Sequence, residues 1–195
     1  GGSDERGRRL LARKAVRRGD RVLDCGAGTG SLSLLAAERT GTDGAVVLLD
    51  FSDDMLAVAR RKLAHAPGNL EFRVGGMEAL PWADASFDVC LSSYSLCPLY
   101  DPHKAALEMY RVLKPGGRLG IAHSAEPENP VVRWLADKLE HLIWAMPFLS
   151  LGCRPVSVRS ILESAGGKLI FETRIGVPLW PFSVFVIEKP ADSRP

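Results

Sequence analysis

The 195-residue chain lacks the features that mark membrane-spanning, metal-binding or strongly basic proteins. No apolar run reaches the roughly 18–20 residues that a helix needs to span a bilayer. The four cysteines are scattered and form no C-x-x-C or cysteine–histidine ligand pattern, so we expect buried thiols and no bound metal. The formal net charge is only +2, which gives no overall field that would favour nucleic acid as a partner.

Repeats, low-complexity linkers and a recognisable signal peptide are also lacking. We therefore expect one cytoplasmic domain over residues 1–195, and contact with a membrane surface stays open. The hydrophobic fraction of 46% is enough to build a sizeable core at this length. Nothing in the sequence indicates an oligomeric state.

The chain does contain a regular alternation of apolar, strand-like runs and helical patterns. Continuous apolar runs such as 45–50 are typical of parallel strands buried on both faces. Alternating strands and helices predict a sheet covered by helices on both sides, and two final runs close in sequence favour an antiparallel pair. We therefore predict a doubly wound, Rossmann-like α/β fold, mostly parallel with an antiparallel C-terminal edge strand. The predicted strands include 45–50, 70–74, 87–94, 118–124, 168–176 and 182–189, and the predicted helices cover 31–39, 53–66, 102–114, 130–146 and 157–165.

The segment RVLDCGAGTG, residues 21–30, places glycines at alternate positions between the first predicted strand and the first predicted helix. Glycine is favoured where φ must be positive or where the backbone must approach another group closely. A strand, a glycine turn and a helix N-terminus together form a common site for an anionic or nucleotide-like ligand. Gly26, Gly28 and Gly30 therefore mark a candidate ligand loop.

Two acids narrow the choice of ligand. Asp24 lies two residues before Gly26, where a carboxylate would repel a phosphate but suits an ammonium group. Asp50 ends the next predicted strand, where a carboxylate can accept two hydrogen bonds from a ribose diol. Ser31 stands where a nicotinamide-dinucleotide fingerprint requires its last glycine. An amino-acid head joined to a ribose describes S-adenosylmethionine (SAM).

Four segments carry a resemblance to a known family: VLDCGAGTG, LLDFSDDMLAVAR, ALPWADASFDVCLSSYSL and ALEMYRVLKPGGRLGIAH. In order and spacing they resemble the class I SAM-dependent methyltransferases, and within these the ubiquinone/menaquinone C-methyltransferase branch. The resemblance implies a cofactor-binding core over 21–125 and acceptor-side helices and strands over 126–195. It also implies SAM as cofactor and S-adenosylhomocysteine as product.

The resemblance assigns roles to single residues. The glycine loop would contact the methionyl part of the cofactor, Asp50 the ribose and Phe51 the adenine face. The family carries an aspartate where this chain has Gly76, although the Met77 backbone N–H could still donate to an adenine ring nitrogen. The predicted cofactor-binding residues are Asp24, Gly26, Ala27, Gly28, Gly30, Asp50, Phe51, Gly76, Met77 and Ser92.

Methyl transfer needs a base only if the acceptor must lose a proton. His123 is the first candidate and Tyr94 the second, because both are expected at carboxyl ends of strands. The missing aspartate at Gly76 keeps a non-catalytic SAM-fold binding module as an alternative. A nicotinamide-dependent oxidoreductase is a weaker alternative, disfavoured by Ser31 and Asp24.

The acceptor is expected to be small and lipophilic, such as a quinone precursor or a lipid head group. Residues 129–152 carry an apolar helical stripe, which is either a cover for the sheet or a lipophilic wall over the acceptor. Trp180 belongs to a second apolar group. The basic side chains between Arg6 and Arg21 form either a solvated helix face or a contact with anionic lipids. Family members normally carry a longer N-terminal segment, which leaves open that the natural chain extends further.

Overall fold

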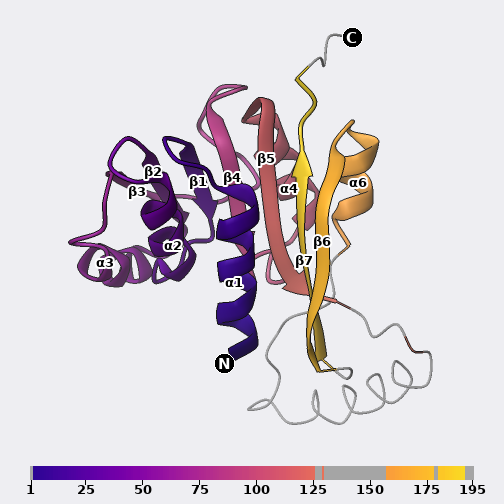
Figure 1. The fold of residues 1–195 in the computed structure, drawn as a ribbon, viewed down its shortest axis with the longest axis horizontal. Helices are drawn as coiled ribbons and strands as arrows, with labels where there is room; N and C mark the ends of the chain where they lie inside the picture. The colour runs from indigo at the N-terminus through magenta and orange to yellow at the C-terminus, as the bar shows by residue number, and fades with distance from the viewer. Residues whose placement is uncertain (1, 126–128, 130–156, 178–179, 192–195) are drawn as a thin grey trace.

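The structure is a computed structural model that describes residues 2–125, 129, 157–177 and 180–191. The helix predicted at 130–146 lies outside these residues. So does the apolar segment 129–152, except for residue 129. Within them, seven strands form one sheet, and helices lie against it (Figure 1). The strands are β1 (Arg21–Cys25), β2 (Ala45–Asp50), β3 (Asn69–Val74), β4 (Phe87–Ser93), β5 (Leu113–Ser124), β6 (Lys168–Val177) and β7 (Trp180–Glu188). The helices are α1 (Gly2–Ala15), α2 (Ser31–Thr40), α3 (Asp53–Lys62), α4 (Pro102–Arg111) and α6 (Arg159–Ser164).

The strand order in the sheet is β3-β2-β1-β4-β5-β7-β6. All neighbouring pairs are parallel except those that involve β7, which runs antiparallel to both β5 and β6. The predicted doubly wound, mostly parallel fold with a C-terminal antiparallel pair is therefore confirmed. The structure adds that β7 lies between β5 and β6, so that β6 forms the edge of the sheet.

The strand order reverses between β1 and β4. From β1 the chain builds the sheet in one direction through β2 and β3, and then returns to add β4 on the other side of β1. In open α/β sheets ligands bind beyond the carboxyl ends of the strands at such a reversal. The carboxyl ends of β1, β2 and β4 therefore locate the candidate site.

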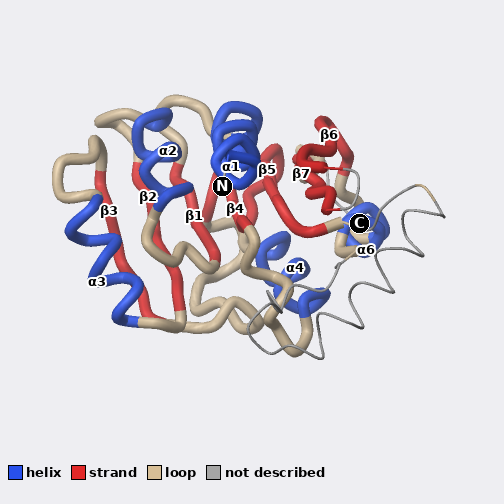
Figure 2. The backbone as a smooth tube through the Cα atoms, turned by 90° about the horizontal axis from the view of Figure 1, so that it is seen from below, coloured by secondary structure: helices blue, strands red, loops and turns tan. Residues whose placement is uncertain are grey.

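Two layers of core residues cover the two faces of the sheet. On one face α1, α2 and α3 contribute Leu11, Leu32 and Leu56 to a cluster that includes Val22 of β1. On the opposite face α4 and α6 pack against a cluster that includes Leu23, the next residue of β1. Figure 2 shows α1 and α2 on one side of the strands and α4 on the other. Burial on both faces explains why β1 and β2 are continuously apolar before they reach an aspartate.

Helix boundaries differ from the predicted ones at the C-terminal ends. The helix predicted at 102–114 ends at Arg111, because Leu113 already pairs with Phe87 of β4. The helix predicted at 53–66 ends at Lys62, where Leu63 donates the last helical hydrogen bond to Ala59. In the part of the chain that the structure describes, no helix is long and apolar enough to cross a membrane.

Candidate functional site

The loop between β1 and α2 adopts left-handed backbone at each of its three glycines. The φ angles are 71° at Gly26, 53° at Gly28 and 76° at Gly30. A Cβ atom at Gly26 would collide with the Ser95 side chain, and one at Gly30 would lie 2.7 Å from Leu63 Cδ1. A Cβ atom at Gly28 would meet no atom within 4 Å. Packing therefore requires the outer two glycines, whereas Gly28 borders open space.

The glycine loop is tied to the end of β2. The N–H groups of Gly26 and Ala27 both donate to the Leu49 carbonyl, at 2.8 and 3.0 Å. The Gly28 N–H donates to Asp50 Oδ2 at 2.8 Å, and the Ser52 N–H donates to Asp50 Oδ1 at 2.9 Å. Each carboxylate oxygen can accept a further hydrogen bond. Asp50 is thus held beside the loop with capacity left for ligand hydroxyl groups.

Asp24 lies in β1, just before the same loop, and is buried with 1% of its surface exposed. Its Oδ2 accepts a hydrogen bond of 2.5 Å from the Ser33 hydroxyl. Its Oδ1 is buried without a hydrogen-bond partner among the described residues. Burial raises the pKa of Asp24 to about 6, against the opposing effects of the Ser33 hydrogen bond and of Arg8 on α1. A buried carboxylate oxygen without a partner suits a cationic ligand group.

The residues expected at the adenine follow β2 and β3. Phe51 is 81% exposed directly after β2. Gly76 is exposed, and a Cβ atom there would meet no atom within 4 Å. Met77 is buried, and its methyl group lies close to Gly26. Glu78, two residues after Gly76, accepts the Asp101 N–H through Oε1 at 2.8 Å.

Ser92 is buried and reaches the glycine loop through a second serine. The Ser92 and Ser95 hydroxyl oxygens are 2.7 Å apart, and Ser95 donates to the Cys25 carbonyl at 3.0 Å. Ser95 therefore stands between Ser92 and Gly26. Sequence reasoning missed both Ser95 and Ser33. A serine on the inward face of an otherwise apolar helix, as in SLSLLAA, is the signal that could have found Ser33.

Tyr94 lies at the carboxyl end of β4, as predicted, in left-handed backbone with φ 58°. Its ring packs edge-on against Phe182 at 5.3 Å, and the Arg8 guanidinium lies 5.3 Å from the ring centre. Its hydroxyl is buried against Gly7 of α1 and has no hydrogen-bond partner among the described residues. Burial raises the pKa of Tyr94 to about 12, so this phenol keeps its proton at neutral pH.

His123 lies near the end of β5 and is buried. Its Nδ1 lies 2.6 Å from the Ser124 carbonyl oxygen, which assigns the proton to Nδ1 and leaves the Nε2 lone pair free to accept. Burial lowers the pKa of the imidazole and favours its neutral form. The ring packs on Phe185, on the α4 side of the sheet, whereas Tyr94 packs on the α1 side. The structure does not bring these two candidates together.

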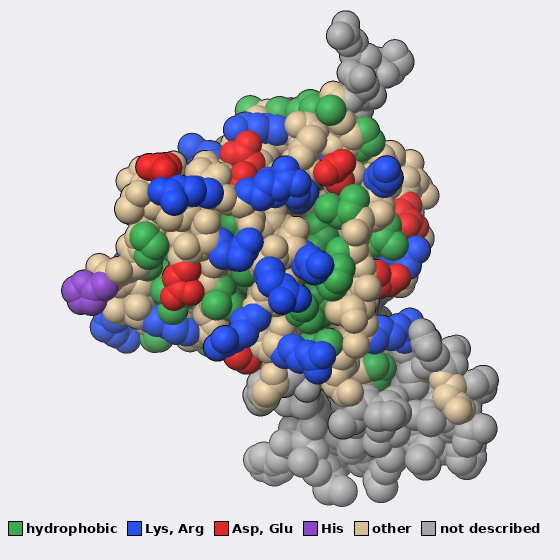
Figure 3. All heavy atoms as spheres, in the orientation of Figure 1, with side chains coloured by type: hydrophobic (Ala, Val, Ile, Leu, Met, Phe, Trp, Pro, Cys, Tyr) green, Lys and Arg blue, Asp and Glu red, His purple; other side chains and the backbone are tan. Residues whose placement is uncertain are grey.

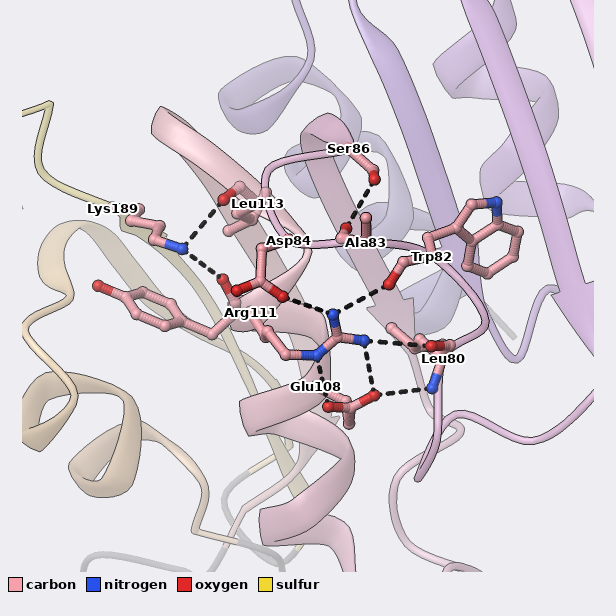
Figure 4. Close-up of polar contacts among 10 residues, drawn as sticks. Leu80, Trp82, Ala83, Asp84, Ser86, Glu108, Arg111, Leu113 and Lys189 are labelled. Atoms are coloured by element: carbon pink, nitrogen blue, oxygen red, sulfur yellow. Dashed lines mark hydrogen bonds and ion pairs between the residues drawn. The ribbon is translucent and has the colours of Figure 1, made fainter.

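One arginine holds the segment that leads from Met77 toward β4 (Figure 4). Arg111 of α4 donates to the carbonyls of Leu80 and Trp82, at 3.1 and 2.9 Å. It also pairs with Asp84 at 2.8 Å and with Glu108 at 2.7 Å, while Glu108 accepts the Leu80 N–H. These contacts fix the segment between Met77 and β4 from α4.

The strand order, the glycine loop after β1 and the acid at the end of β2 together define the class I SAM-dependent methyltransferase fold. A family model described as a methyltransferase domain matches residues 17–151, and the chain belongs to that family.

A curated relative and two solved structures illustrate the similarity. The chain is 39% identical over 133 residues to the ubiquinone/menaquinone biosynthesis C-methyltransferase UbiE of Marinomonas sp. (strain MWYL1), covering 67% of this chain and 53% of that protein. A SAM-dependent methyltransferase from Aquifex aeolicus superposes with a TM-score of 0.66 at 22% identity, over 93% and 88% of the two chains. The [4+2]-cyclase SpnF superposes with a TM-score of 0.72 at 20% identity, over 95% and 81%.

These similarities have different weight. The two superpositions show a shared fold alone, and one of them is named for a reaction other than methyl transfer. The chain spans about half the length of the curated relatives it matches. Activity must therefore be argued from the site itself.

Proposed function

We propose that this chain binds SAM at the Gly26–Gly30 loop and transfers its methyl group to a small, lipophilic acceptor. The observation that carries the proposal is Gly28, which has left-handed backbone, borders open space and donates its N–H to the acid that ends β2. A loop with these three properties leaves room for a ligand directly against the backbone.

The residues around the loop fit the parts of this cofactor. Asp24 has a buried oxygen with no hydrogen-bond partner in the described part of the chain, which suits the ammonium of the methionyl group. Asp50 can accept hydrogen bonds from the ribose hydroxyls, and Phe51 offers an exposed ring for the adenine face. Gly76 leaves the adenine amino group without a carboxylate partner at that position, which weakens binding by about 1 kcal/mol for one neutral hydrogen bond.

The sulfonium of bound SAM makes its methyl group electrophilic, so the main task of the protein is to orient the acceptor in line with it. His123 is the residue suited to take a proton from the acceptor, because it is neutral and its Nε2 is free to accept. Tyr94 keeps its proton at neutral pH, so its phenol is not available as a base. We therefore assign the base to His123 and give Tyr94 no role in the reaction, because it packs on the other side of the sheet with its hydroxyl against Gly7.

The lipophilic acceptor is supported by the apolar segment ending at residue 152 and by the quinone-related name of the relative. The test is transfer of a tritiated methyl group from SAM into total lipid and small-molecule extracts. We expect label in a lipid-soluble product. Label confined to polar small molecules would overturn the lipophilic acceptor while leaving methyl transfer intact.

Calorimetry separates the competing activities. S-Adenosylhomocysteine should bind with measurable heat and NADH should not. Binding without any methyl transfer would instead support a non-catalytic SAM-binding module. NADH binding at the glycine loop would support an oxidoreductase.

A further inference from the structure

A basic groove lies between α1 and α2, outside the candidate site. It has a volume of about 680 Å³ and carries four arginines, Arg6, Arg9, Arg13 and Arg39. The first three recur on α1 at helical spacing and so share one face. Leu10 and Leu35 contribute apolar surface to the same groove. Figure 3 shows Lys and Arg side chains gathered over this face, with hydrophobic side chains between them.

Most of these arginines form no strong ion pair with another described residue. Among the described residues, Arg6 and Arg13 take part in no ion pair. Arg9 pairs with Glu5 at 3.0 Å, but both side chains are largely exposed, at 69% and 45%, so the pair contributes little to stability. Arg39 donates through Nε to the Val16 carbonyl at 3.1 Å. Two acids, Glu5 and Glu38, also line the groove, and the arginines outnumber them.

Positive charge is concentrated around this helix. Residues 2–20 contain seven basic and three acidic side chains, although the whole chain carries a net charge of only +2. Guanidinium groups pair with phosphate oxygens, and an apolar floor suits the adjoining carbon chain of a lipid. Among the described residues that line the groove, none carries an aromatic ring on which a nucleic-acid base could stack. We propose that the groove between α1 and α2 docks the protein on the anionic phosphates of a membrane surface.

The groove lies near the carboxyl ends of β4 and β5, through the N-terminal half of α1. The N-terminal end of α1 lies at the same end of the molecule as the carboxyl end of β5 (Figure 1). Gly7 of α1 also lies against the Tyr94 hydroxyl, at the carboxyl end of β4. Docking through α1 therefore brings the carboxyl edge of the sheet close to the lipid surface.

Vesicle co-sedimentation tests the proposal without cofactor or acceptor, so its outcome does not depend on the proposed methyl transfer. The protein is mixed with vesicles of phosphatidylcholine alone or of phosphatidylcholine with phosphatidylglycerol. We expect binding to the anionic vesicles only, weakened by added salt. The variant Arg6→Gln/Arg13→Gln should bind about twenty-five-fold more weakly, since each basic residue near an anionic surface contributes about five-fold.

The matched control removes two positive charges from elsewhere. Arg73→Gln/Lys104→Gln changes exposed residues of β3 and α4, and it should bind within about two-fold of the wild type. Equal binding to both vesicle types would overturn the proposal. So would an equal loss of binding in the two double variants, or tighter binding to an RNA oligonucleotide than to anionic vesicles. Circular dichroism melting checks that all variants fold.

Discussion

At the scale of single residues, the candidate site combines two aspartates whose surroundings differ. Asp50 accepts two backbone N–H groups, whereas Asp24 is buried and one of its oxygens has no hydrogen-bond partner among the residues that the structure describes. Desolvation disfavours the charged form of Asp24, and a cationic ligand would offset that cost. The two carboxylates therefore suit different parts of one ligand.

Asp24 should make stability depend on pH. Because burial raises its pKa from 3.8 to about 6, the folded protein keeps a proton that the unfolded chain has already lost between these values. Stability therefore falls as the pH rises through this window and stays lower above it. Asp24→Asn should stabilise the ligand-free protein by about 3 kcal/mol at neutral pH and have little effect in acid. Thermal melts across the pH range check this, with the exposed Asp54→Asn as control. A pH-independent difference would contradict the pKa assignment.

Ligand binding gives a second readout of the same group. If the ionised Asp24 pairs with an ammonium, affinity for S-adenosylhomocysteine should weaken as the pH falls below about 6. This pH dependence should vanish in Asp24→Asn. Its persistence in that variant would place the ammonium elsewhere.

Asp50→Ala should weaken S-adenosylhomocysteine binding at least about tenfold, because each charge-assisted hydrogen bond contributes about 1.5–3 kcal/mol. The substitution also frees the Gly28 N–H, so a lower melting temperature is expected as well. Calorimetry on the folded variant measures the affinity. Asp54→Ala, an exposed acid in the first turn of α3, is the matched control. An unchanged dissociation constant for Asp50→Ala would remove Asp50 from the site.

The sequence was sufficient to find these two acids and the three glycines, because each stands at a fixed offset from a strand. It was not sufficient to pair Ser33 with Asp24, or to find Ser95 or Arg8. Only tertiary packing brings Ser33 from α2 and Ser95 from the segment after β4 to these partners, and places Arg8 of α1 near enough to lower the pKa of Asp24.

At the scale of elements, α4 supports the candidate site through Arg111. Its guanidinium holds two carbonyls and two carboxylates around the loop that follows Met77. Lysine cannot reproduce this planar fork, so Arg111→Lys should destabilise the protein by about 1.5–3 kcal/mol. Denaturant unfolding measures the loss. Arg159 also pairs with two exposed acids, Glu163 and Glu172, and serves as the control. Arg159→Lys should lower the stability of the protein by less than about 1 kcal/mol. Equal effects of the two changes would show that the loop does not depend on Arg111.

At the scale of the whole molecule, the alternating pattern predicted the class of fold but not the order of the strands. Strand order depends on pairings between distant segments, such as β5 with β7. The insertion of β7 between β5 and β6 follows from those pairings, and short apolar runs carry no sign of it. The packing of α1 beside α2, which forms the basic groove, is likewise a long-range contact.

The central claim, that the Gly26–Gly30 loop binds SAM, is tested most directly by comparing two glycine substitutions. Gly28 and Gly19 both have left-handed backbone, with φ 53° and 78°, and a Cβ atom at either would meet no atom within 4 Å. Alanine at either position should therefore lower the stability of the protein by a similar amount, about 1–2 kcal/mol, through backbone strain. Titration with S-adenosylhomocysteine should show wild-type affinity for Gly19→Ala. For Gly28→Ala the affinity should fall at least about tenfold, because the added methyl group would occupy ligand space. Equal affinity of the two variants, or no binding to the wild type, would contradict the account.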